Sequence, residues 1–250
     1  FYNEMEKNKD IISQVRCYAD IEENMKAGKM SAILTGEEGD ICAGSLEMLR
    51  NYYRLGLRMM TLTWNHENEL AYPNYVAYNS DGSCRYNADA SKGLKQKGFE
   101  FIAEMERLGI VIDVSHLSDA GFWDVVRLSR RPVVASHSNS RAVCPHRRNL
   151  TDDMFRAIRD SGGVAGLNYY QHFVGDDPTM EGLVRHVEHF LELDGERSLC
   201  LGGDMDGCEL LAGGMRGLED VPLLWQALAD RGYPQSLLED LFWNNLRRLI

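Results

Sequence analysis

The chain contains 250 residues, 44% of them hydrophobic, and carries a formal net charge of −11 at pH 7. This length and composition suit one α/β domain or two small ones. The acidic balance argues against nucleic acid or an anionic membrane as a partner, because phosphate binding needs a basic surface. No apolar run approaches the roughly 18 to 20 residues of a membrane span, and the first residues lack a signal-peptide pattern.

Residues 1–30 are rich in charge and carry a loose apolar stripe that stops at Gly28, which predicts a single helix. Residues 31–37 form a short apolar run that ends in a carboxylate, and we predict the first strand there. Residues 45–55 have leucine and tyrosine at helical spacing, and Gly56 after them is a typical helix terminator.

The next predicted strand, residues 58–64, leads into a polar loop that runs from residue 65 to about residue 91. A loop of this length in a compact domain is usually functional or mobile. A helix is predicted over residues 92–108, and Gly109 follows it.

Two apolar, β-branched runs at the centre of the chain, residues 111–116 and 132–137, each end in Ser-His. Both predict buried strands. Ser118 can cap a helix between them, and a right-handed crossover then makes the two strands parallel. We therefore expect His116 and His137 at the same edge of the sheet, the carboxyl edge at which α/β folds place their chemistry.

The last third of the chain continues the alternation. Thr151 is predicted to cap a helix, and residues 164–169 form the fifth strand. A helix over residues 182–193 precedes the sixth strand, residues 198–204. From residue 218 onward the chain is predicted to be helical.

This alternation predicts an α/β protein with a parallel sheet, in a single domain over residues 1–250. Six strand-and-helix units are evident, whereas a closed (β/α)8 TIM barrel needs eight, so the barrel interpretation requires that its first strands are missing. An open doubly wound sheet needs no missing strands. It is, however, expected to carry a glycine-rich phosphate loop after its first strand, and Thr35-Gly-Glu-Glu-Gly39 is not one.

Six cysteines are scattered along the chain without a Cys-x-x-Cys pair. A chain of this size does not need disulfides to stabilise its core, so we expect reduced thiols in a cytoplasmic protein. A disulfide framework and a zinc ribbon are both disfavoured. The cysteines are Cys17, Cys42, Cys84, Cys144, Cys200 and Cys208.

Four predicted strands end in groups that bind metal ions or transfer protons: Glu37, His116, His137 and Asp204. Carboxylate oxygen and neutral imidazole nitrogen are ligands of Zn²⁺ in catalytic sites. A single histidine at a strand end is more often a hydrogen-bonded structural residue. Four such residues at one sheet edge favour a metal site.

Three arginines cluster in the loop after the second Ser-His pair: Arg141, Arg147 and Arg148. A guanidinium there could form a bidentate pair with a substrate carboxylate. We expect one of the three to do so.

The remaining histidines are expected to be structural or exposed. His186 and His189 share a helix face but lack the glutamate of a His-Glu-x-x-His motif. Asp113 lies inside a predicted buried strand and is interpreted as a structural hydrogen-bond acceptor, with support of a metal ligand as the less favoured alternative. The loop histidines, expected at the surface, are His66, His146 and His172.

Several segments carry a family resemblance, and they are Glu37-Glu-Gly39, Leu55-Gly-Leu-Arg58-Met-Met-Thr-Leu-Thr63, Asp113-Val-Ser-His116-Leu-Ser-Asp119, Pro132-Val-Val-Ala-Ser-His137-Ser-Asn-Ser-Arg141, Arg148-Asn-Leu-Thr-Asp152, Gly162-Gly-Val164 and Gly202-Gly-Asp204-Met-Asp206-Gly207. Together they resemble the membrane (renal) dipeptidase family of zinc peptidases, in the same order along the chain. The resemblance runs from about residue 31 to the end.

The resemblance implies a (β/α)8 barrel that hydrolyses dipeptides with two zinc ions. Glu37 would bridge the two ions, and His116 and His137 would complete the second. A hydroxide that bridges the metals would attack the peptide carbonyl. Arg148 would bind the terminal carboxylate of the substrate, and Asp204 would handle the proton passed to the leaving amine.

Two features depart from the family pattern. The family's first strand supplies a His-x-Asp pair to the other zinc ion, and no such pair precedes Glu37. Trp64 stands where the mammalian enzymes have a histidine that contacts the substrate. Trp64 is therefore a candidate substrate-binding residue, and His66 is an alternative.

We predict a zinc-dependent dipeptidase with a small dipeptide as substrate and a second copy of the chain as a candidate partner. Two alternatives stay open. Another barrel metal hydrolase, such as a deaminase or a lactonase, would share the ligands at the strand ends but would not need Arg148. A truncated, metal-poor homologue that only binds a peptide would match the missing His-x-Asp pair.

Overall fold

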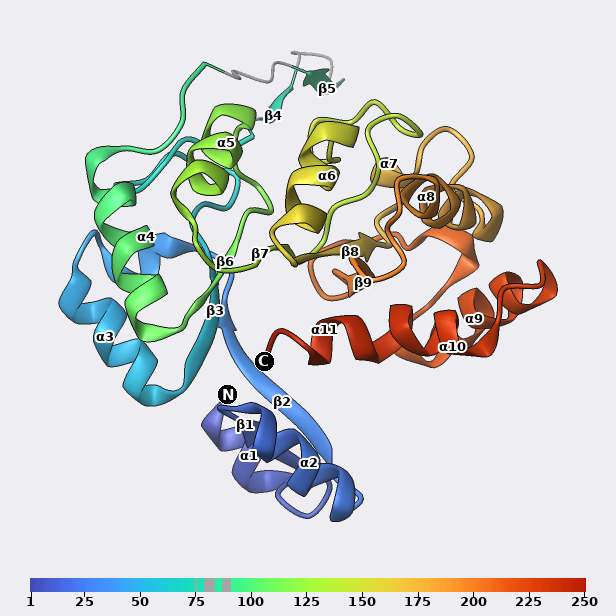
Figure 1. The fold of residues 1–250 in the computed structure, drawn as a ribbon, viewed down its shortest axis with the longest axis horizontal. Coiled ribbons are helices and arrows are strands. Elements are labelled where there is room, and N and C mark those ends of the chain that lie inside the picture. The colour runs from blue at the N-terminus through green and yellow to red at the C-terminus, as the bar shows by residue number, and fades with distance from the viewer. Residues whose placement is uncertain (75, 79–83, 87–90) are drawn as a thin grey trace.

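The computed structural model describes residues 1–74, 76–78, 84–86 and 91–250 (Figure 1). The other ten residues belong to the long polar loop predicted over residues 65–91, and that part of the prediction lies outside the described residues. The described part of this segment is not all loop. Strands β4 (Val76–Tyr78) and β5 (Cys84–Tyr86) pair antiparallel within it.

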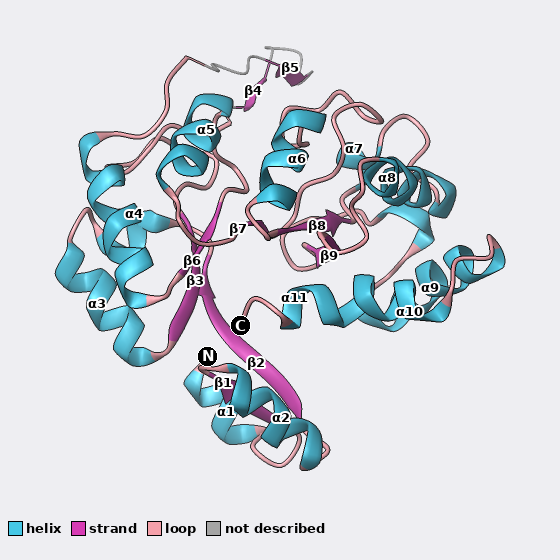
Figure 2. Cartoon of the chain, viewed as in Figure 1, coloured by secondary structure: helices cyan, strands magenta, loops and turns pink. Residues whose placement is uncertain are grey.

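The fold is built around a curled sheet of seven parallel strands in the order β1-β2-β3-β6-β7-β8-β9. Figure 2 shows the sheet curving from β2 and β3 through β6 and β7 to β8 and β9, with helices on its outer side. The α/β barrel class predicted from the sequence is confirmed as a partial barrel. The strands are β1 (Ile12–Val15), β2 (Met30–Gly36), β3 (Leu57–Thr61), β6 (Val111–Asp113), β7 (Val133–Ala135), β8 (Val164–Asn168) and β9 (Leu199–Gly203).

The prediction of one helix over residues 1–30 is wrong. Strand β1 lies within this segment and pairs in parallel with β2, so that Ile12 is opposite Met30. The same apolar residues fit a strand or a helix stripe, because a run this short does not distinguish the two periods. The pairing with β2 decides for the strand, and the helices α1 (Tyr2–Lys7) and α2 (Tyr18–Lys26) flank it.

The other predicted helices are present, and Ser118 and Thr151 cap theirs as expected from the sequence, while Ser45 is a further cap that the structure adds. Ser45, Ser118 and Thr151 each accept a hydrogen bond from a backbone N–H three residues later. Gly56 and Gly109 end their helices in the left-handed conformation. The main helices are α3 (Leu46–Leu55), α4 (Gln96–Leu108), α5 (Asp119–Leu128), α6 (Asp152–Asp160), α7 (Gln171–Val174), α8 (Met180–Glu192), α9 (Val221–Asp230), α10 (Gln235–Glu239) and α11 (Asn245–Arg247).

The two faces of the sheet are packed differently. Side chains alternate along a strand, so on β7 Val133 belongs to the core between sheet and helices, whereas Val134 belongs to a smaller cluster inside the curl. On β6 the outward residue is Ile112, and Val111 packs against the inner cluster. Asp113, two residues after Val111, therefore lies on the inner face at the carboxyl end of the strand.

Strands β6 and β7 are shorter than predicted, since they end at Asp113 and Ala135. Each Ser-His pair consequently lies just beyond its strand, at the edge of the sheet where the loops begin. Among the described residues, none of the helices combines the length and the apolar character that a bilayer crossing needs.

Candidate metal centre

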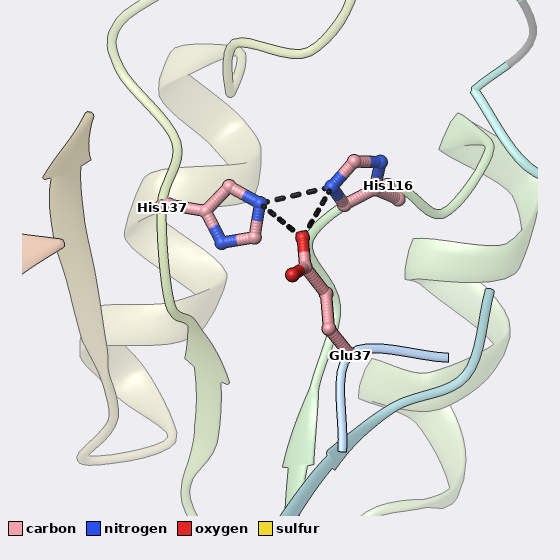
Figure 3. Close-up of side chains that lie close together, drawn as sticks. All are labelled: Glu37, His116 and His137. Atoms are coloured by element: carbon pink, nitrogen blue, oxygen red, sulfur yellow. Dashed lines mark hydrogen bonds and ion pairs between the residues drawn. The ribbon is translucent and has the colours of Figure 1, made fainter. Parts of the chain in front are cut away.

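Glu37, His116 and His137 converge just beyond the carboxyl ends of β2, β6 and β7 (Figure 3). The Nε2 atoms of the two histidines are 2.9 Å apart, and Oε1 of Glu37 lies 3.4 Å from one and 3.6 Å from the other. Both imidazoles are buried, whereas the Glu37 side chain is 53% exposed. The open side of the cluster is therefore the glutamate side.

The second nitrogen of each imidazole has a hydrogen-bond partner. Nδ1 of His116 lies 2.9 Å from Oδ1 of Asn65, and Nδ1 of His137 lies 2.7 Å from Oγ of Ser136. If both Nδ1 atoms carry the hydrogen, both Nε2 atoms present lone pairs to each other and to Glu37. Three lone pairs at these distances repel unless a cation lies among them, so the ligand set fits a metal ion of the zinc type.

Burial, together with the positive charge of Arg148, keeps the imidazoles neutral. Burial, and after it the positive charge of Arg148, lowers the pKa of both His116 and His137 below the ordinary value of 6.5. Burial also raises the pKa of Glu37, and the nearby carboxylates of Asp204 and Asp113 raise it further. Neutral imidazoles are the form that binds metals, and a cation would offset the repulsion felt by Glu37.

Of the three arginines in the loop after β7, Arg148 is the one whose surroundings suit binding of a substrate carboxylate. Its side chain is 4% exposed, and its Nε and Nη2 atoms have no hydrogen-bond partner among the described residues. Burial lowers the pKa of Arg148 to about 10, although Asp204, Asp113 and Glu37 attract its charge. A charged group with free N–H donors beside the cluster can accept an anionic ligand.

The neighbouring Arg141 has a different environment. It forms a bidentate ion pair with Asp119 and also donates to the backbone carbonyl of Asn149. These contacts join the loop after β7 to the start of α5, and they give Arg141 a structural role. Arg147 is buried and accepts through its carbonyl from Asn74 and Arg141.

Asp204 follows β9 and adopts a left-handed backbone with φ of 64°. Its Oδ2 accepts a hydrogen bond of 3.1 Å from the amide of Asn168, a fully buried residue at the end of β8. Asn168 is also bonded to the backbone of Tyr170 and to Asn139. Neither Asn168 nor Asn65 was predicted from the sequence, because an asparagine at a strand end or in a loop has no distinguishing pattern until its neighbours are known.

Trp64 lies beside the cluster. Its side chain is 42% exposed, and its ring centroid is 6.2 Å from that of His116. The exposed His66 ring packs edge-on against Trp64, with the two ring centroids 5.4 Å apart. Glu38 turns away from the histidines and accepts from the backbone N–H of Trp64 and from Asn68.

Other histidines are placed as follows. The expectation that His146 is exposed is wrong, since it is buried against Phe173 with ring centroids 4.5 Å apart. Packing of a distant aromatic residue over the loop buries it, and nothing in the local sequence indicates this. His186 is structural, as predicted, because its ring bridges the backbone of Ser140 and Val174.

The profile of one protein family matches the whole chain, residues 1–250, and that family is described as membrane dipeptidase (peptidase family M19). The chain belongs to this family. The membership confirms the resemblance read from the sequence motifs. It also agrees with the fold, because a solved metallopeptidase named as a dipeptidase of family M19 superposes on 99% of this chain with a TM-score of 0.89 at 30% identity.

Three similar proteins illustrate the range of the match. A Klebsiella pneumoniae protein encoded in the pqqA 5′ region is 36% identical over 210 residues, 81% of this chain and 74% of its own length. The dipeptidase verJ of Clonostachys rogersoniana is 30% identical and aligns with 98% of this chain, which spans 61% of the verJ length. A Rhodobacter sphaeroides metallopeptidase, solved with a phosphinate mimic of the dipeptide L-Ala-D-Ala, superposes with a TM-score of 0.89 at 30% identity, over 99% of this chain and 71% of the peptidase.

Proposed function

We propose that this chain is a metal-dependent dipeptidase in which Glu37, His116 and His137 bind zinc. The convergence of one carboxylate oxygen and two imidazole nitrogens from three strand ends carries the proposal. Family membership and the dipeptide mimic bound by the Rhodobacter sphaeroides peptidase support a dipeptide as the substrate.

When bound, the metal would supply a Lewis acid for the peptide carbonyl and lower the pKa of water at the site. The protein residues perform the other tasks. Arg148 binds the terminal carboxylate of the dipeptide through its free Nε and Nη2 donors. Asp204, oriented by the Asn168 amide, transfers a proton to the leaving amine. Trp64 forms one wall for the substrate side chain.

The number of ions is part of the proposal. The family pattern uses two zinc ions, and the cluster of Glu37, His116 and His137 provides ligands for one complete half of that site. We expect a zinc ion to bind at the two histidines, as the ion that the resemblance gives as the second of the pair. Metal analysis of the purified chain tests this directly, because His116→Asn and His137→Asn should each reduce the zinc content of the protein.

The assay compares dipeptides, including L-Ala-D-Ala, with nucleosides and lactones as substrates. Hydrolysis of dipeptides that requires zinc and is lost in His137→Asn would support the proposal. A preference for nucleosides or lactones would instead indicate a deaminase or a lactonase. Zinc binding without any hydrolysis would favour a protein that only binds peptides.

A further inference from the structure

Asp113 is a buried carboxylate that the proposed reaction does not use. It is 1% exposed and lies where β3, β6 and β7 end on the inner side of the sheet. Its Oδ1 accepts from the backbone N–H groups of Ser115 and Ser136, at 3.0 and 2.9 Å. Its Oδ2 accepts from the hydroxyls of Thr61, at 2.7 Å, and of Ser136.

The single hydroxyl hydrogen of Ser136 determines the direction of the next contact. Oγ of Ser136 is within hydrogen-bond distance of both Asp113 Oδ2 and His137 Nδ1. An ionised carboxylate has no hydrogen to give, so the hydroxyl must donate to Asp113. Both lone pairs of Oγ are then acceptors, one toward Ser115 Oγ at 3.3 Å and one toward His137, so the hydrogen between Oγ and the imidazole must belong to Nδ1.

We propose that Asp113, acting through Ser136, holds His137 in the Nδ1–H tautomer and so leaves its Nε2 free to bind the cation. Asp113 and Ser136 are positioning residues, since neither contacts Glu37 or a reacting atom. The inference rests on the proposed metal site for its purpose. The direction of the hydrogen bonds, from His137 Nδ1–H to Ser136 and from the Ser136 hydroxyl to Asp113, is a property of the metal-free protein.

The other imidazole is held differently, which makes the proposal specific. His116 has the neutral amide of Asn65 as its Nδ1 partner, with no carboxylate behind it among the described contacts. Replacing Asp113 should therefore change the tautomer of His137 and leave that of His116 unchanged. A general loosening of the site would affect both rings.

The decisive variant is Asp113→Asn. The two backbone N–H groups at Oδ1 retain the amide oxygen there, so the new NH2 group takes the Oδ2 position and donates to Ser136. The hydrogen of Ser136 is then released to the shorter of its two other contacts, His137 Nδ1 at 2.7 Å as against Ser115 Oγ at 3.3 Å, and the ring carries its own hydrogen on Nε2. We expect two-bond ¹H–¹⁵N spectra of the metal-free protein to show this switch at His137, and zinc affinity to fall about 10- to 100-fold.

Three further variants serve as controls. Thr61→Val removes the other hydroxyl from Oδ2 but keeps the Ser136 link, so the tautomer and zinc affinity should stay as in the wild type. In Ser136→Ala, His137 should no longer be held in one tautomer, and the affinity for zinc should fall about tenfold. Ser136→Thr keeps a hydroxyl, so it should have the wild-type tautomer of His137 and the wild-type zinc affinity. This pair decides the question if Asp113→Asn does not fold.

An Asp113→Asn protein whose His137 stays in the Nδ1–H form with wild-type zinc affinity would overturn the inference. So would a Ser136→Ala protein with both properties unchanged. Failure of the proposed function has a different signature, because a wild-type chain that binds no zinc can still show the tautomer switch on substitution of Asp113.

Discussion

At the scale of single residues, the site combines burial with backbone strain. His116 and Asp204 both have positive φ, at 70° and 64°, although neither is glycine. Such conformations cost about 1 kcal/mol or more for a non-glycine residue and persist where the surrounding structure enforces them. Asp204 directly follows β9, and His116 lies three residues beyond the end of β6, so both left-handed residues are at the carboxyl edge of the sheet.

The role of Arg148 predicts a loss that depends on the substrate carboxylate. Because each hydrogen bond to a charged group contributes about 1.5–3 kcal/mol, Arg148→Ala should raise KM for dipeptides about 10- to 100-fold or more. Steady-state kinetics would measure this, with dipeptide amides as the control. The amides lack the carboxylate, so an equally large effect on them would contradict the clamp role.

The role of Asp204 predicts an effect on kcat. Asparagine tolerates the left-handed backbone and can keep the contact with Asn168, so Asp204→Asn should preserve the fold and zinc content. It should lower kcat about 10²- to 10⁴-fold with little change in KM, because the side chain no longer transfers a proton. A variant with wild-type kcat would remove Asp204 from the mechanism.

At the scale of elements, the outer helices are joined by buried charges as well as by the apolar core. Glu104 on α4 accepts from Arg50 on α3 at 2.6 Å and from Arg107 on its own helix at 2.7 and 2.8 Å. These contacts hold α3 and α4 side by side over β3 and β6. Arg107, and after it Arg50, lowers the pKa of Glu104 from 4.5 to about 2.

This lowered pKa predicts a pH-dependent effect of Glu104→Gln. A carboxyl whose pKa is lower in the folded state stabilises the fold fully above pH 4.5, and the contribution is lost as the pH falls toward 2. Urea unfolding at neutral pH should show a loss of about 1–2 kcal/mol, which shrinks at acid pH.

The matched control for this measurement is Glu47→Gln. Glu47 is the exposed partner of Arg50, at 3.6 Å, and an exposed pair contributes little. The unfolding free energy of the Glu47→Gln protein should stay within about 0.5 kcal/mol of the wild-type value. A pH-independent loss in Glu104→Gln would show that packing, and not charge, accounts for the effect.

At the scale of the whole molecule, the proposed ligands come from β2, β6 and β7, which span the middle of the seven-stranded sheet. A cation bound by all three would connect the end of β2 directly to the ends of β6 and β7, from which β3 separates it in the sheet. Metal binding and folding should therefore be linked, since the unfolded chain holds no preformed site.

This linkage predicts that zinc raises the melting temperature. At a free zinc concentration about 100-fold above Kd, the stabilisation is about 2.7 kcal/mol, or about 5–10 °C for a chain of this size. Differential scanning calorimetry with zinc, and again after chelation, would measure the shift. His116→Asn should abolish it, and a full shift in that variant would place the zinc elsewhere.

The sequence alone determined the class of fold, most helix boundaries and the residues that meet at the sheet edge. Helix ends follow from local chemistry, such as the Ser118 cap and Gly109 terminator, so they can be read without knowing the fold. The position of Glu37, His116 and His137 also followed from sequence, because parallel strands bring their carboxyl ends to one edge.

Only the tertiary structure decided the features that depend on distant partners. Pairing with β2 made residues 12–15 a strand, and packing against Phe173 buried His146. The partners of the imidazoles, Asn65 and the Ser136–Asp113 pair, likewise depend on contacts between separate loops and strands. A hydrogen bond needs its two atoms within about 3 Å of each other, and no pattern along the chain specifies which residues the fold brings that close.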